Sequence, residues 1–248
     1  MKSRAGRAQP FIRGFASQSA SRVQSDLISP RRFWRSLLAG AVGLALGPAG
    51  EAWSSLSFPP FREVHQMAIA NVLAAPAGPV ADAHLIEILQ DQQTEVDHDQ
   101  DARHSFEHAM TGVEDGHGEN VERANYIKWT NEFIHDRLVE AIDHRHKNEV
   151  EQAYESLGKA IHPLQDATSP VHEKFQPWYD DEGLLDFARH GFQERVYPED
   201  SRRDRLEGVV RYAYAIFMEA IGPVPTQYFD GKGDLLPQTY HTPLPAKK

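Results

Sequence analysis

The chain has 248 residues, of which 40% are hydrophobic and 25% charged, as in globular proteins and unlike collagen-like or wholly disordered chains. Its net charge of −10 is unevenly distributed, because residues 1–52 hold eight Lys and Arg against two acidic residues and the remainder carries −16. Cysteine is absent, which excludes disulfides and thiolate metal sites, whereas all 13 histidines follow residue 52.

Residues 1–52 have the pattern of an export signal. A basic stretch ends in the pair Arg31-Arg32, and an uncharged run of fifteen residues follows from Ser36 to Gly50. That run is shorter than the roughly 20 apolar residues of a membrane-spanning helix, but it suits a signal peptide, and the paired arginines resemble a twin-arginine signal. We predict cleavage after Ala52 and an exported, periplasmic or extracellular protein. The alternative is an N-terminal anchor helix that is not cleaved.

Residues 53–222 predict an all-α protein, a single bundle-like helical domain. Apolar residues recur there at spacings of three and four, and no segment sustains the alternation of a strand. The expected helices cover residues 65–73, 84–89, 121–142, 150–161, 184–196 and 205–221, and breaker-rich segments separate them at 75–79, 115–119 and 168–170. Residues 223–248 contain five prolines and predict an irregular C-terminal tail.

Histidines and acidic residues at helical spacing carry the chemical signal. His162 and Asp166 lie four residues apart near the end of a predicted helix, so both side chains emerge on one face. His190 and Glu194 repeat this spacing, and His172 lies between the two pairs, just after a proline that ends the helix. A solvated, ion-paired helix surface produces such pairs as well. Two pairs with an intervening histidine nevertheless favour a metal site.

The stretch from Tyr154 to His172 resembles the central motif of the zinc-dependent phospholipase C and single-strand-specific nuclease superfamily. In that motif a Leu-Gly helix precedes His-x-x-x-Asp, a proline and a second His ten residues after the first. The later pair His190-x-x-x-Glu194 is similar to the family's second pair, and its Glu resembles the phospholipase branch. Mature family members begin with a Trp whose amino nitrogen and carbonyl oxygen bind zinc, followed by a His in the first helix. By this resemblance, Trp53 and His65 take those positions.

The family's remaining ligands are an Asp after the second helix and a His about a dozen residues later. Asp97 follows the helical run at 84–89, and His108-Ala109-Met110 resembles the cluster around the family's His, so we assign these two residues. The competing candidates in the same stretch are Asp91, His98, Asp99, Asp101 and His104.

The resemblance implies three zinc ions in one cleft. The first would be bound by Asp97, His108, His162 and Asp166, the second by His172, His190 and Glu194, and the third by Trp53, His65 and the other oxygen of Asp166. It also implies hydrolysis of a phosphodiester, with Asp166 and Asp97 as the catalytic residues. Asp166 would bridge two ions, and Asp97 could act as a general base.

The choice of phosphodiester depends on charge. A net charge of −16 after residue 52 disfavours a polyanionic nucleic acid, although bound zinc would offset part of it. A phospholipase C needs one phosphate in its site and some apolar surface. The candidates for that surface, each of which suits the protein core equally well, are Phe106, Phe175, Trp178, Tyr179 and Phe187. We therefore expect a secreted phospholipase C that acts on phospholipid head groups and contacts the membrane surface transiently. The alternatives are a single-strand-specific zinc nuclease and a non-catalytic secreted zinc-binding protein.

Overall fold

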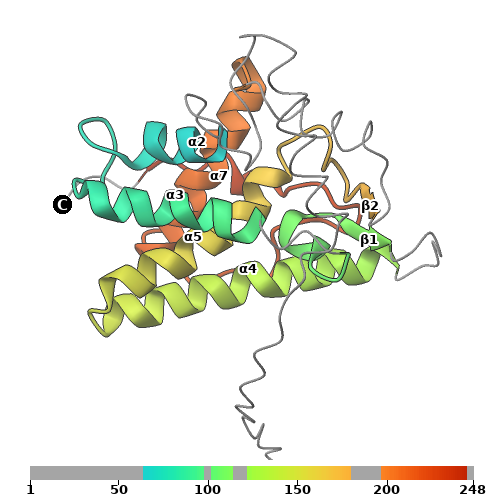
Figure 1. Cartoon of the computed structure of the whole chain (residues 1–248), viewed down its shortest axis with the longest axis horizontal. Coiled ribbons are helices and arrows are strands. Elements are labelled where there is room, and N and C mark those ends of the chain that lie inside the picture. The colour runs from blue at the N-terminus through green and yellow to red at the C-terminus, as the bar shows by residue number, and fades with distance from the viewer. Residues whose placement is uncertain (1–63, 98–101, 114–121, 180–196, 245–248) are drawn as a thin grey trace, which may run out of the picture.

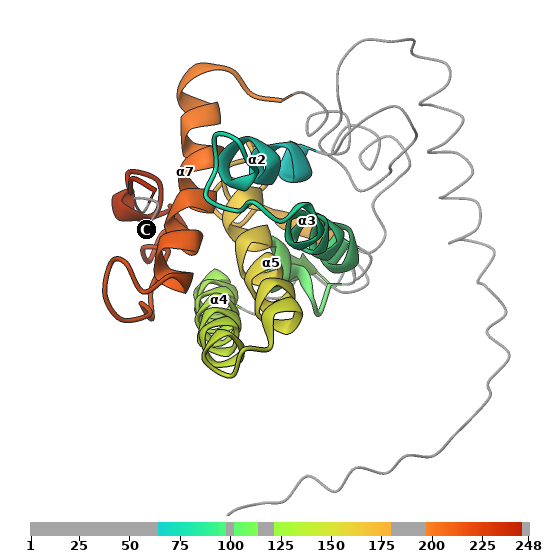
Figure 2. The ribbon, with the colours of Figure 1, turned by 90° about the vertical axis from the view of Figure 1, so that its left-hand side faces the viewer.

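The structure is a computed structural model that describes residues 64–97, 102–113, 122–179 and 197–244, and these residues are mainly helical (Figure 1). The prediction of a helical domain is confirmed for this part of the chain. Its α-helices are α2 (Val64–Leu73), α3 (Ala83–Asp97), α4 (Arg123–His146), α5 (Val150–Asp166) and α7 (Asp200–Phe217). Figure 2 shows α5 in the centre, with α2, α3, α4 and α7 around it. None of the described helices combines the length and the apolar character that crossing a membrane requires.

The central position of α5 follows from its sequence, because its apolar residues form one broad face and its last turns are buried on every side. Leu157, Ile161 and Leu164 are fully buried and pack in the same core as residues of α3, α4 and α7. Burying a Leu or Ile side chain contributes about 1.5–3 kcal/mol, so α5 anchors the domain. All residues from Ala160 to Asp166 are buried, including the polar ones. The polar end of the helix is therefore held inside the protein.

A glycine allows α3 to lie close against α5. A Cβ atom on Gly158 would lie 2.7 Å from the Cβ of Gln92 and 3.3 Å from the carbonyl oxygen of Leu89. The first distance is shorter than a carbon–carbon contact allows, so a larger residue would push the helices apart. This close approach brings the inner face of α3 within reach of the buried end of α5.

The described helices differ from the predicted bounds at their ends: α4 continues to His146, and α7 begins at Asp200 and ends at Phe217. Helices α3 and α5 also continue past their predicted ends. Helix α5 continues through Pro163 to Asp166, although a proline removes one backbone hydrogen bond from a helix. Burial of the surrounding turn offsets this loss, which local sequence rules do not capture. Helix α3 continues to Asp97, because its polar second half turns Gln92, Gln93 and Val96 inward. The helix predicted at 184–196 lies outside the described residues, as does the predicted signal segment 1–52.

Short elements complete the described structure. The strands β1 (Thr111–Val113) and β2 (Pro177–Tyr179) pair in parallel, whereas the sequence predicted no strand, because three residues are too few to show an alternating pattern. The 3-10 helices are η1 (Ser105–His108) and η2 (Pro237–Thr239).

The C-terminal segment after residue 222 packs on the helices. Its Tyr228, Phe229 and Leu235 side chains are buried in the common core. Asn131 of α4 fixes this segment, since its Oδ1 accepts hydrogen bonds from the backbone N–H groups of Tyr228 and Phe229 at 2.7 and 3.3 Å. The hydrophobic core therefore includes residues past 222, although the described part of this segment is irregular apart from η2.

Candidate metal centre

Five histidine and aspartate side chains meet at the C-terminal end of α5. His162 and Asp166 come from α5, and His65 comes from the first turn of α2. Asp97 is the last residue of α3, and His108 is the last residue of η1. Four elements that are distant in the sequence thus place five of the predicted ligands together.

The position of His108 depends on how η1 is attached. The hydroxyl of Thr130 on α4 donates a hydrogen bond to the carbonyl oxygen of Phe106 at 2.7 Å. The next residue after His108, Ala109, is fully buried and has a left-handed backbone with φ of 51°. A non-glycine residue adopts this conformation at a cost in free energy, so packing holds the turn. The result is a His108 side chain that is only 8% exposed.

The first group of ligand atoms is formed by Asp97, His108, His162 and Asp166. His162 Nε2 lies 3.1 Å from Asp166 Oδ2, 3.1 Å from His108 Nδ1 and 3.4 Å from Asp97 Oδ1. His108 Nδ1 lies 3.1 Å from Asp166 Oδ2 and 3.8 Å from Asp97 Oδ1. Two ligands of a tetrahedral zinc ion with bonds of about 2.0–2.1 Å lie about 3.3 Å apart. The five distances lie around this value, so these atoms are spaced much as the ligands of one zinc ion would be.

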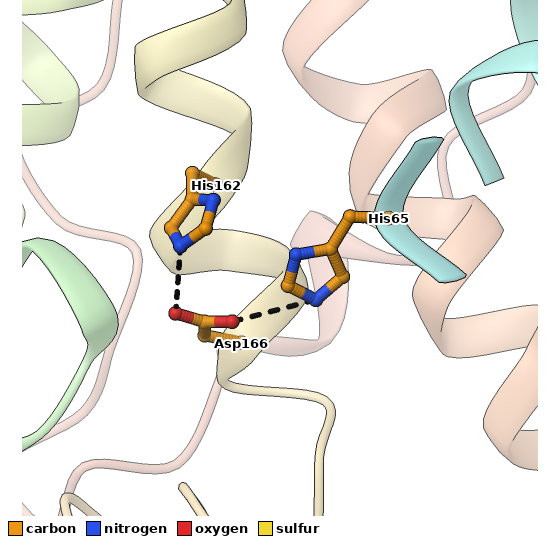
Figure 3. A group of neighbouring side chains, drawn as sticks. All are labelled: His65, His162 and Asp166. Atoms are coloured by element: carbon orange, nitrogen blue, oxygen red, sulfur yellow. Dashed lines mark ion pairs between the residues drawn. The ribbon is translucent and has the colours of Figure 1, made fainter. Parts of the chain in front are cut away.

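The second group uses the other oxygen of Asp166. His65 Nε2 lies 3.4 Å from Asp166 Oδ1, whereas Asp166 Oδ2 faces His162, as Figure 3 shows. The rings of His65 and His162 meet edge to face with centroids 5.2 Å apart. The two oxygens of one buried carboxylate thus face two different histidines, an arrangement that could hold two cations with Asp166 between them.

His172 lies close to this cluster and is buried. Its Nδ1 lies 2.7 Å from the carbonyl oxygen of His108, to which it donates a hydrogen bond. This bond leaves the lone pair on Nε2, the usual arrangement of a histidine prepared for a metal. The residues predicted to share an ion with it, His190 and Glu194, lie outside the described residues, as does Trp53. Their roles as ligands stay predictions.

The competing candidates lie elsewhere or outside the described residues. Asp91 is exposed on α3, and His104 packs against the ring of Phe106 with centroids 6.4 Å apart. Neither belongs to the two groups of converging ligand atoms found among the described residues. His98, Asp99 and Asp101 lie outside those residues.

The aromatic residues that were candidates for lining the substrate site also lie in different surroundings. Phe175 is only 1% exposed and packs in the core against Phe229, so of its two possible roles, lining the site or filling the core, it has the second. Phe106 is a half-buried residue of η1, and its ring contacts Trp129, which is 37% exposed. Trp178 lies in β2, and Phe187 lies outside the described residues.

Burial and charge determine the protonation of the cluster. Burial alone would lower the pKa of His162, but the carboxylates of Asp166 and Asp97 raise this pKa well above its usual value. Burial would likewise raise the pKa of Asp166, yet the neighbouring histidines, His162 above all, hold that pKa well below its usual value. Burial lowers the pKa of His65 to about 4, so His65 is neutral at pH 7. The cluster therefore stabilises positive charge between its carboxylates, while His65 beside it is neutral.

Sequence reasoning missed two buried glutamines. Gln165 Nε2 donates a hydrogen bond to the carbonyl oxygen of His65 at 3.1 Å and so ties α2 to α5 beside Asp166. Gln93 lies one helical turn before Asp97 and contacts His162. Only their positions in the sequence could have identified these two glutamines: Gln93 shares the helix face of Asp97, and Gln165 directly precedes Asp166.

The buried groups fit a cation. Imidazole nitrogens of His108 and His162 and carboxylate oxygens of Asp97 and Asp166 converge in a buried place, where such groups need a compensating charge. Buried histidine and aspartate groups that could hold a metal ion are therefore present. Comparison with known proteins gives no match to a protein-family model, to a curated protein or to a solved structure.

Proposed function

We propose that the protein is a zinc-dependent phosphodiester hydrolase of the phospholipase C type. The observation that carries this proposal is the buried carboxylate of Asp166, whose two oxygens face His65 on one side and His108 and His162 on the other. A carboxylate shared between two cation sites is suited to a hydrolase that uses several metal ions.

The types of ligand atom favour zinc. The two groups offer imidazole nitrogens and carboxylate oxygens, whereas calcium and magnesium prefer sites made of oxygen. Asp97, His108, His162 and Asp166 would hold one ion, and His65 and Asp166 would contribute to another. When bound, zinc supplies Lewis-acid chemistry that activates water and offsets charge on phosphate oxygens.

The protein's own side chains have separate tasks in this proposal. Asp166 fixes the spacing of the two sites, because it is rigidly held at the buried end of α5. The pKa of Asp97 is lowered by His162, against the opposing effect of burial, so its carboxylate is ionised at neutral pH. A low pKa makes a good anionic ligand but a weak general base. We therefore assign Asp97 first to metal binding and only secondly to proton transfer from water.

Charge and surface support a phospholipid as substrate. The chain after residue 52 carries −16, which repels a nucleic acid along any extended groove. The ring of Trp129 on α4 contacts the rings of Phe106 in η1 and of Tyr126, and Trp129 is partly exposed. Such side chains suit the boundary between water and lipid.

A side-by-side assay tests the proposal. Protein from an export-competent host, loaded with zinc, is incubated with phosphatidylcholine vesicles, with vesicles of other phospholipids and with single-stranded DNA. We expect release of phosphorylated head groups from lipid, and loss of this release in Asp166→Asn. The matched control is Asp143→Asn, which removes an exposed carboxylate paired with Lys147 and should retain activity.

Each other outcome counts against the proposal in a different way. Cleavage of DNA alone would replace it with the nuclease. Bound zinc without hydrolysis of any substrate would favour a zinc-binding protein without enzymatic activity. Wild-type protein that binds no zinc would overturn the metal centre itself.

A further inference from the structure

Gln93 is a fully buried glutamine between α3 and α5. It lies one turn before Asp97 on α3, and the close approach at Gly158 brings its side chain against α5. A buried amide must satisfy two N–H donors and one oxygen acceptor, so its contacts define its orientation.

Those contacts leave one orientation for the amide. Gln93 Nε2 donates hydrogen bonds to the carbonyl oxygens of Leu89 at 3.1 Å and Gly158 at 3.0 Å. Both acceptors are backbone carbonyls, which cannot donate, so the nitrogen must face them. Gln93 Oε1 then faces His162 Nδ1 at 3.2 Å and can only accept.

This orientation determines the proton position on His162. Because Gln93 Oε1 accepts, Nδ1 of His162 must carry a hydrogen and donate it. The other ring nitrogen, Nε2, faces Asp97, His108 and Asp166. A histidine ligand whose second nitrogen donates to a fixed acceptor has its ring and its tautomer set for metal binding.

We propose that Gln93 is a positioning residue that sets the tautomer of His162 and presents its Nε2 to a metal ion. The inference rests on the proposed zinc centre. It adds to that centre a residue which does not touch the metal and acts through His162 alone.

The experiment compares three variants of the full chain. Gln93→Met keeps length and helix propensity but removes the acceptor, and we expect zinc affinity to fall about 10–100-fold. Gln93→Glu keeps an acceptor for Nδ1 but loses both donations to backbone carbonyls. We expect it to be less stable than wild type and yet to bind zinc far more tightly than Gln93→Met. Gln92→Met is the matched control, since Gln92 is the buried residue directly before Gln93 and its Oε1 has no hydrogen-bond partner among the described residues.

Two measurements decide the outcome: zinc affinity by chelator competition, and ¹⁵N NMR of labelled histidines with His162 assigned from a His162→Gln spectrum. We expect zinc-loaded wild type and Gln93→Glu to show His162 protonated at Nδ1 and ligated through Nε2. A packing role predicts instead that affinity follows stability, with Gln93→Glu weaker than Gln93→Met, and that order would overturn the inference. A zinc affinity of Gln93→Met equal to that of wild type would also overturn the inference. If wild-type protein binds no zinc, the proposed function and the inference both fail. If Gln93→Met binds zinc as tightly as wild type does, the inference alone fails.

Discussion

Two histidine–carboxylate pairs among the described residues have the same helical spacing and lie in opposite surroundings. On α4, His144 Nε2 lies 3.9 Å from Glu140, and these side chains are 24% and 40% exposed. On α5, His162 Nε2 lies 3.1 Å from Asp166, and these side chains are 0% and 4% exposed. Both pairs join residues four apart, so spacing alone does not distinguish them.

The neighbours of each pair make the difference. His144 also contacts Glu149, and Glu140 is bonded to Arg137, so the α4 pair belongs to an exposed network of opposite charges in water. Around His162, the ligand atoms of His108, Asp97 and Asp166 converge inside the protein. Exposed pairs contribute little to stability, whereas a buried group of charges needs compensation. A bound cation can supply that compensation only in the second case.

Removal of metal should have the largest effect and should act on the buried cluster alone. Zinc at about 1,000 times its dissociation constant stabilises a folded protein by about 4 kcal/mol, or roughly 8–16 °C in melting temperature for a chain of this size. We expect a chelator to lower the melting temperature of zinc-loaded protein by that amount. Thermal melts followed by circular dichroism, with zinc measured by elemental analysis, check it. An unchanged melt after proven zinc removal would contradict the metal centre.

Matched histidine substitutions compare the two pairs directly. His162→Gln removes a ligand atom from the site of Asp97, His108, His162 and Asp166, so we expect the zinc ion of that site and hydrolysis to be lost and the chelator effect to become smaller. His144→Gln removes an exposed ion pair worth about 0.2–1 kcal/mol and should leave zinc content unchanged. Zinc content and melting temperature of both variants are the measurements. Equal behaviour of the two would mean that burial does not separate the pairs.

The sequence predicted much of the helical domain because apolar spacing reports directly on buried helix faces. It predicted less well where burial depends on distant segments. The turn from His162 to Asp166 contains a proline and three polar residues, so a local pattern places a helix end near it. In the structure this turn is enclosed by other elements and remains helical. The polar half of α3 was missed for the same reason, since its inward face consists largely of glutamines.

The candidate site was predictable where a motif names residues at fixed spacing, as for His162, Asp166 and His172. Asp97 and His108 came from a stretch crowded with acids and histidines, and only the folded chain shows that these two face His162. Gln93 could not be identified, because its role depends on two backbone carbonyls and one imidazole from other turns. No residue spacing encodes such a contact.

Substitution of Gly158 should transmit a packing change to the buried cluster. Gly158→Ala places a Cβ atom 2.7 Å from the Cβ of Gln92, and overpacking of this kind costs about 1–3 kcal/mol. The higher helix propensity of alanine offsets about 1 kcal/mol of this cost, so we expect the free energy of unfolding to fall by roughly 0–2 kcal/mol. Zinc affinity should fall as well, because α3 carries Gln93 and Asp97. Gly231→Ala is the control, since a Cβ atom there meets open space. Undiminished zinc affinity in Gly158→Ala would show that the helix spacing does not control the cluster.

The smallest effect should come from the exposed network at the end of α4, through the carboxylate of Glu219. A hydrogen bond from His146 and the nearby Arg145 lower the pKa of Glu219 below its usual value of 4.5. A group with a lowered pKa in the folded state stabilises that state above the unfolded pKa and loses this contribution as pH falls through the folded pKa. We therefore expect Glu219→Gln to be slightly less stable than wild type from about pH 5 to 6, with the difference vanishing as pH falls below 4.5 and shrinking in high salt. Melting temperatures of the two proteins from pH 3 to 6, at low and high salt, measure this difference. A loss of stability that persists at the lowest pH would mean that Glu219 acts through packing. A loss of stability as large as that of His162→Gln would mean that exposed and buried pairs do not differ in their effect.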